Sequence, residues 1–402
     1  MEFGFTYKDV FRSVRFGASP KKIWIGLVGT FIATVFYAIF SYIAFLLSGW
    51  GIKNIWQTFR FIPWPFYNVS LTWYGWIFWI IGALISLFFY FITSTAISKI
   101  TFEQLKGDEF YESKEAWKFA YKNWKGTFLS PIYLAIFIGI LLLVGLVFGL
   151  IGRIPYVGQI IIALFSIPLI SGAFFIVYLT IVMFVVMIIA PAVVSTTESD
   201  TFDTLFEGFS VLNDQTWRFF LWNFILGICV FLASFVFALL LLYTLKLTHW
   251  ALGVWAGPRN WLNVMWEQGK WYLYLPFAPT FLLKWFPGIV SPTVYPSIGT
   301  LPVNPGITTP FAGFLLGLVF YFVVFGIVGY ALSVFQAGQT IIYITLVKLK
   351  DDKNLLEKKE EIFEAEKKEE EKKEEEKKEE EKEEGEKEEK KRIIKRKTPK
   401  KK

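Results

Sequence analysis

The stretch TFLSPIYLAIFIGILLLVGLVFGLIG, residues 127–152, runs for 26 residues without a charged side chain. An α-helix rises about 1.5 Å per residue, so this stretch can cross the roughly 30 Å hydrocarbon core of a bilayer. Five more segments have the same length and character and contain no Asp, Glu, Lys, Arg or His: 23–48, 73–98, 159–190, 219–245 and 310–347. The sequence therefore predicts an all-α integral membrane protein with six transmembrane helices.

Basic residues in the connecting segments predict the orientation of these helices. Segment 1–22 carries five Lys or Arg residues and segment 99–126 carries six lysines, whereas 49–72 has two basic residues and 153–158 has one. Because Lys and Arg are enriched in cytoplasmic loops, we expect both termini to lie in the cytoplasm. The membrane is expected to be the inner or plasma membrane of the cell. The first apolar run is too long for the core of a cleaved signal peptide and is expected to be retained.

An apolar pattern with helical spacing recurs in the three segments expected to be cytoplasmic. Its members are Tyr7, Val10, Phe11 and Val14; Trp117, Ala120, Tyr121 and Trp124; and Phe202, Leu205, Phe206 and Phe209. Each set fits one face of an amphipathic helix. The pattern predicts three parallel units of one amphipathic cytoplasmic helix plus one transmembrane hairpin, about 5–98, 112–190 and 200–347, within a membrane domain of residues 1–347. Contact with lipid headgroups and simple packing on the bundle are both open for these helices.

The outer loop 246–309 is rich in Trp and Pro and is expected to be mostly irregular, with short helices only before Pro276. Indole side chains favour the headgroup region, so an aromatic belt is the simpler interpretation. The alternative is a surface for a lipid or a partner protein. The candidate contact residues are Trp250, Trp255, Trp261, Trp266 and Trp271.

The tail 348–402 alternates blocks of Lys and Glu and has almost no apolar residues, so it cannot form a globular core. A solvated tail without a defined partner is the simpler interpretation. Its last thirteen residues contain nine Lys or Arg and no acid, which favours anionic lipid headgroups as partners over nucleic acid. The candidate contacts are Lys390, Lys391, Arg392, Lys395, Arg396 and Lys397.

Four carboxylates, Glu198, Asp200, Asp203 and Glu207, follow the fourth apolar segment within ten residues, and the last three are the candidate polar site. We expect Asp200 or Ser199 to cap the next helix and Asp203 to lie in its first turn. A polar functional site is the alternative. The segment has no His or Cys, and the chain has a single histidine, His249, and a single cysteine, Cys229. No GxxxxGK[ST] phosphate-binding loop occurs either, so the sequence predicts no metal, no cofactor and no catalytic site.

The sixth segment is too long for one straight crossing, so either its helix continues into the cytoplasm or it breaks at Gly338. Two glycine pairs have the GxxxG spacing that permits close helix packing, Gly145 with Gly149 and Gly313 with Gly317.

Three stretches carry a resemblance: ESKEAWKFAYKNW followed by Pro131, GRIPYVG at 152–158, and 190–220, in which Pro191, Phe202–Asp203 and Trp217–Arg218 follow in order. Here the chain resembles a group of uncharacterised bacterial polytopic inner-membrane proteins, and more distantly the membrane domain of some glycerophosphodiester phosphodiesterases. The resemblance implies six spans with amphipathic cytoplasmic helices and no assigned activity.

The sequence favours a non-enzymatic scaffold or accessory protein that organises lipid or partner proteins. The alternative is a transporter or permease subunit for a neutral or amphipathic substrate. A carrier requires a polar-lined cavity at mid-membrane, whereas a scaffold is packed solid there. A row of polar residues facing inward from three spans, seen in a structure, would overturn the scaffold interpretation.

Overall fold

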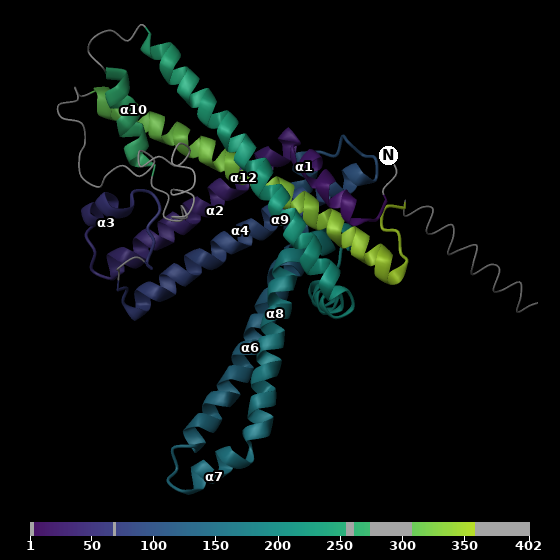
Figure 1. Ribbon diagram of the computed structural model, residues 1–402. Helices are drawn as coiled ribbons and strands as arrows, with labels where there is room; N and C mark the ends of the chain where they lie inside the picture. The colour runs from purple at the N-terminus through teal and green to yellow at the C-terminus, as the bar shows by residue number, and fades with distance from the viewer. Residues whose placement is uncertain (1–3, 67–69, 255–260, 274–307, 358–402) are drawn as a thin grey trace, which may run out of the picture. The chain divides into compact units, whose positions relative to one another are not determined.

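The computed structural model describes residues 4–66, 70–254, 261–273 and 308–357 (Figure 1). In this part of the chain the regular structure is entirely helical. Six helices are long and apolar enough to cross a membrane: α2 (Pro20–Leu47), α4 (Trp73–Leu105), α6 (Trp124–Ile151), α8 (Ser166–Thr197), α9 (Thr201–Gly253) and α12 (Thr308–Asp351). The prediction of a multi-pass helical membrane protein is confirmed.

Shorter helices precede the first of these six or lie between them. They are the 3-10 helix η1 (Tyr7–Phe11), α1 (Arg12–Gly17), α3 (Ile52–Phe59), α5 (Ser113–Lys122), α7 (Val157–Leu164) and α10 (Trp261–Tyr272). Helices therefore occupy all three stretches with the repeated apolar pattern. The internal repeat itself stays a prediction, as does the division into a membrane domain and a tail.

A kink separates the third amphipathic helix from the fifth span. α9 runs from Thr201 to Gly253, and its backbone is non-helical at Gln215. Two helices therefore meet at this kink: the first contains Phe202 to Phe209, and the second forms the fifth span. The helix also extends eight residues beyond the expected end of the span at Leu245.

The fourth span is shorter at its start and longer at its end than predicted. The chain breaks at Phe165, which separates α7 from α8. Pro168 explains the break, because in a continuous helix the proline ring would clash with the backbone carbonyl of residue 164. Pro191, expected at the end of the span, lies inside α8, and the helix ends only where Glu198 adopts a left-handed backbone with φ 57°.

Burial on the three surface helices follows small residues instead of the predicted aromatic positions. The buried positions include Ser13 and Gly17 on α1, Ala116 and Ala120 on α5, and Thr204 and Gly208 on α9. Phe11, Tyr121, Phe202 and Phe206 are exposed, so these four side chains do not pack inside the bundle, and their contact with headgroups stays a prediction. Small side chains allow the helix backbones to approach their neighbours, so the aromatic side chains project from the edges.

The second half of α12 is the centre of the bundle. From Gly329 to Val347 almost every residue is buried, and the helix packs against α1, α2, α4, α8 and α9 (Figure 1). Gly338 lies inside an unbroken helix, so of the two alternatives for the sixth segment the continuous helix is correct. Its neighbours enclose it on all sides, which is why the amphipathic pattern of a surface helix is missing from this sequence.

The α6–α8 hairpin is buried at one end only. Its buried residues are Gly126 to Leu134 on α6 and those from Leu179 onward on α8. Between these points the apolar side chains are open, with Leu146 65 % and Phe174 77 % exposed. This half of the hairpin has only its own partner helix and α7 as neighbours among the described residues.

Candidate functional site

Polar side chains are buried together where the helices converge on α12. We call this set the polar cluster: Lys22, Ser98, Lys99, Thr101, Asn223, Ser333, Gln336 and Gln339. Seven of the eight are buried, and Asn223 is partly buried. A buried polar group costs stability unless it finds a hydrogen-bond partner, so a cluster of them needs mutual contacts.

Three helices contribute to a row of hydrogen bonds in this cluster. The Ser98 hydroxyl on α4 donates to Gln336 Oε1 on α12 over 3.4 Å. The Gln339 amide donates to the Oδ1 of Asn223 on α9. These two separate pairs bring polar side chains of three helices together. A polar row facing inward from three spans is the observation that would overturn the scaffold, so the depth of these pairs in the membrane decides how they count.

Close packing surrounds this row. A Cβ added to Gly338 would stand 2.1 Å from a methyl group of Leu226, and one added to Gly17 would stand 2.5 Å from the backbone of Val334. Gln336 also lies about 42 Å along α12 from Thr308, which places it beyond a 30 Å crossing that begins there. The row therefore lies near one end of the bundle, enclosed by neighbouring helices.

Lys22 is the most enclosed charged group of the cluster. Its side chain is 0 % exposed and its Nζ donates to the Thr101 hydroxyl over 3.0 Å, with the ring of Phe16 5.8 Å away. Within the described part of the chain, no carboxylate lies within 4 Å of this amine. Lysine is almost never fully buried without a charged partner, so Lys22 is an unusual residue of this fold.

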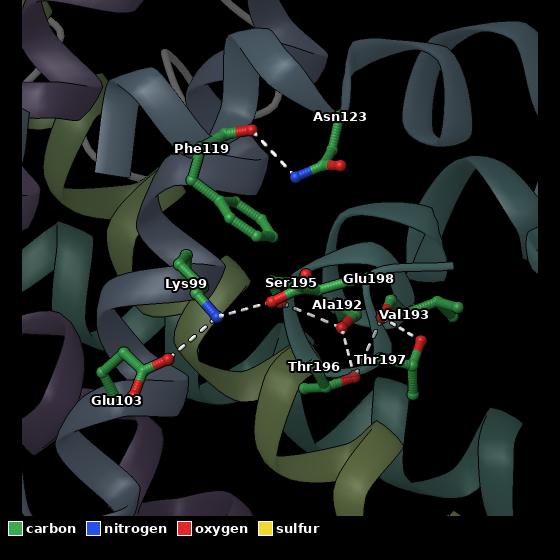
Figure 2. Close-up of polar contacts among 10 residues, drawn as sticks. All are labelled: Lys99, Glu103, Phe119, Asn123, Ala192, Val193, Ser195, Thr196, Thr197 and Glu198. Carbon is green, nitrogen blue, oxygen red and sulfur yellow. Dashed lines mark hydrogen bonds and ion pairs between the residues drawn. The ribbon is translucent and has the colours of Figure 1, made fainter. Parts of the chain in front are cut away.

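Lys99 stands nearly two turns before the end of α4 and is paired (Figure 2). Its Nζ lies 2.8 Å from Glu103 Oε1 and 4.0 Å from Glu198 Oε1, and 4.5 Å above the ring of Phe119 on α5. Glu198 ends α8, so this one ammonium joins α4, α5 and α8. Hydroxyl groups of Ser195, Thr196 and Thr197 donate to carbonyls of α8 in the same region.

Tyr111 borders this group of charges. Burial, reinforced by nearby carboxylates, chiefly that of Glu103, raises the pKa of the Tyr111 hydroxyl from 10.0 to about 12. The phenol therefore stays protonated across the physiological range. In that form it can donate a hydrogen bond but cannot act as a general base.

The carboxylates after α8 act in different ways. Asp200 is the N-cap of α9 and accepts a hydrogen bond of 2.9 Å from the Asp203 amide, as predicted, and Asp203 is exposed in the first turn. Glu112, the corresponding residue before α5, makes no such cap. Glu207 is half-buried, 4.0 Å from the Nζ of Lys350 on α12. The three carboxylates thus do not converge on one point.

The outer tryptophans fall into three environments. Trp250 and Trp261 are exposed. Trp266 is buried against Phe320 at 5.3 Å between ring centroids, and His249 lies 4.6 Å from it. Trp271 stacks under the Arg60 guanidinium at 4.0 Å. Trp266 is therefore part of the α10–α12 contact, and contact of Trp250 and Trp261 with a lipid or partner protein stays a prediction.

Some candidates lie outside the described residues, namely Trp255 and the tail residues Lys390, Lys391, Arg392, Lys395, Arg396 and Lys397. The described residues contain no group of three His, Cys, Asp or Glu side chains placed to hold a metal ion.

Sequence reasoning missed Lys22 and Lys99. Lys22 immediately precedes the first apolar segment and Lys99 immediately follows the second, so both were counted as loop residues. A basic residue adjacent to an uncharged run was the available signal, since helices extend past the limits of an apolar segment by a turn or more.

Searches against protein-family models, curated proteins and solved structures gave no match for this chain.

Proposed function

We propose that this protein is a non-enzymatic membrane scaffold that organises lipid or partner proteins, and that a partner helix packs on its α6–α8 hairpin. The observation that carries this proposal is the open half of the hairpin. A transmembrane helix pair gains stability from packing against other helices, and this one has such packing only at one end.

The small residues of α6 support a protein partner at this place. Gly139, Gly145 and Gly149 each have no atom within 4 Å of the position that a Cβ would take. The Gly145–Gly149 pair therefore does no packing inside the chain. Such a pair lets a second helix approach closely, which is the condition for van der Waals attraction between helices in lipid.

The test is a Gly145→Leu/Gly149→Leu double variant, expressed in full-length form and isolated from membranes after cross-linking. The substitutions leave internal packing intact, so loss of a cross-linked partner or second copy is the expected result. Gly227→Leu on α9, which also has open space at its Cβ, is the matched control. The proposal is wrong if the wild-type protein gives no cross-linked species, or if the double variant gives the same species as the control.

A transporter or permease subunit is the second candidate, and the polar row favours it. Ser98, Gln336 and Asn223 come from three of the six long helices, and such polar groups could line one end of a substrate path. The enclosure of the row favours the scaffold. A Ser98→Cys variant without Cys229 separates the two, because a thiol in a path that opens reacts with a small maleimide in membranes. Labelling equal to that of an exposed Phe11→Cys control would support the carrier, and protection would support the scaffold.

Orientation and tail are further parts of the proposal. We place both termini in the cytoplasm of an inner or plasma membrane and the basic end of the tail on anionic headgroups, on the strength of the Lys and Arg distribution. The resemblance to uncharacterised bacterial inner-membrane proteins belongs here too. Its three stretches fall at α5, at the turn between α6 and α7, and at the junction of α8 with α9.

A further inference from the structure

We propose that a groove between α2 and α3 holds one acyl chain of an anionic phospholipid, whose phosphate pairs with Lys53. The site uses no residue of the α6–α8 hairpin, and it stands or falls independently of the scaffold proposal.

The shape and lining of the groove fit an acyl chain. It is an open groove of about 740 Å³, lined by Ala38, Ile39, Tyr42 and Ile43 of α2, by Ile52, Lys53 and Trp56 of α3, and by Phe61. This volume is in the usual range of small-molecule sites. Apart from Lys53, the side chains that line it are aliphatic or aromatic, so dispersion and exclusion of water are the attractions available to a ligand inside the groove.

The polar atom in the wall is already engaged. The Tyr42 hydroxyl, at the inner side of the groove, donates to the carbonyl of Arg60. A sugar or a nucleotide would leave its own polar groups without partners against such a wall, which costs free energy. An aliphatic chain has no such groups.

The position along α2 places the groove at a membrane boundary. Ile39 and Ile43 lie about 26 and 32 Å along the helix from Lys22, at a rise of about 1.5 Å per residue. If Lys22 marks one edge of a hydrocarbon core of about 30 Å, the groove meets the other. Helix α3 follows α2 directly (Figure 1). Ile55 and Phe59 of α3 are buried, and Lys53 is exposed. Such an amphipathic helix suits the level of the phosphates.

Charge selects an anionic headgroup. The sequence contains no Asp or Glu between Asp9 and Glu103, so neither α2 nor α3 supplies a carboxylate. Within the described residues Lys53 has no acidic side chain within 4 Å, whereas the other cation of this loop, Arg60, is stacked on Trp271. Lys53 therefore remains available to a phosphate at the rim of the groove.

The experiment is native mass spectrometry of the full-length protein in detergent, with added dioleoyl phosphatidylglycerol or dioleoyl phosphatidylcholine. We expect the wild-type protein to retain phosphatidylglycerol more tightly. Lys53→Gln removes the phosphate contact and should reduce that preference about fivefold. Ile39→Trp fills the groove and should remove the retained lipid of either kind. Because Ile39 is 49 % exposed, the larger indole side chain fits without disturbing the packed interior, and the variant should fold.

Lys246→Gln is the matched control, because Lys246 is also an exposed lysine beyond the end of an expected span and lies outside the groove. A free fatty acid in place of the phospholipid tests whether the chain alone suffices. Equal retention of the two phospholipids by the wild type, equal effects of Lys53→Gln and Lys246→Gln, retention by Ile39→Trp, or tighter binding of the fatty acid would each overturn the assignment. None of these results depends on the hairpin variants.

Discussion

Lys22 and Lys99 lie in the same polar cluster but have opposite surroundings. Lys99 has a carboxylate at 2.8 Å, and Lys22 has a hydroxyl group at 3.0 Å and no solvent contact. Removing one partner of a buried ion pair leaves an uncompensated charge, whereas removing an unpaired buried ammonium relieves a desolvation cost. We therefore expect the same substitution, to methionine, to have opposite effects at the two positions.

Lys99→Met should lower the free energy of unfolding by about 1–3 kcal/mol, because Glu103 loses its partner while the packing over Phe119 is kept. Lys118→Met, at an exposed position of α5, is the control and should change little. Reversible unfolding in mixed micelles measures both. Equal stability of the two variants would show that the pair contributes nothing.

Lys22→Met should leave the free energy of unfolding unchanged or raise it by up to about 2 kcal/mol, since methionine fills the same space without a charge. Lys22→Ala should lower it, because it leaves a cavity. The same unfolding experiment decides. A Lys22→Met protein as unstable as Lys22→Ala would mean that the ammonium itself is required.

The raised pKa of Tyr111 predicts that the stability of the folded protein decreases at alkaline pH. Its pKa is about 12 in the folded chain against 10.0 for an unperturbed phenol, so the folded state holds the proton more tightly. Its contribution to stability is complete below pH 10 and is lost as the pH rises from 10 to about 12. A Tyr111→Phe variant should lack this component. Ultraviolet difference titration of the two proteins should give a tyrosinate signal near pH 12, and a signal near pH 10 would contradict the assignment.

At the scale of elements, glycine sets the distance between α2 and α12. A Cβ on Gly329 would stand 2.6 Å from the Leu27 amide nitrogen, and one on Gly26 would stand 2.6 Å from the Gly329 carbonyl oxygen. Neither glycine belongs to the two GxxxG pairs seen in the sequence. Of those, Gly313 and Gly317 pack against Gln268 and Tyr272 of α10 instead of another span. The GxxxG spacing within one helix indicates that another helix can pack closely there. It does not determine which helix that is.

Gly329→Ala should lower the free energy of unfolding by about 1–3 kcal/mol, because backbone atoms of α2 cannot move aside as a flexible side chain can. Gly326→Ala, on the same helix with open space around its Cβ, should be neutral or gain up to about 1 kcal/mol from helix propensity. Thermal unfolding followed by tryptophan fluorescence compares them. A Gly329→Ala protein as stable as Gly326→Ala would contradict the close approach.

At the scale of the whole molecule, an even number of crossings puts both ends of the chain on one side. In a Cys229→Ser background, single cysteines at Arg153 and Lys246 should react with an impermeant maleimide in intact cells. Cysteines at Lys8 and Asp352 should react only after permeabilisation. If intact cells label one cysteine of the Arg153 and Lys246 pair and one of the Lys8 and Asp352 pair, at least one predicted span does not cross the membrane.

The sequence alone determined the six spans, because transfer into hydrocarbon depends on the length and composition of each segment and needs no other part of the chain. It also located the Asp200 cap, which is a contact between residues three apart. The tertiary structure decided the polar cluster. Ser98 and Gln336 are 238 positions apart, and Lys22 reaches Thr101 across 79. Which polar groups are buried together depends on how separate helices pair, and helices with uniformly apolar surfaces carry little periodicity from which that pairing could be inferred.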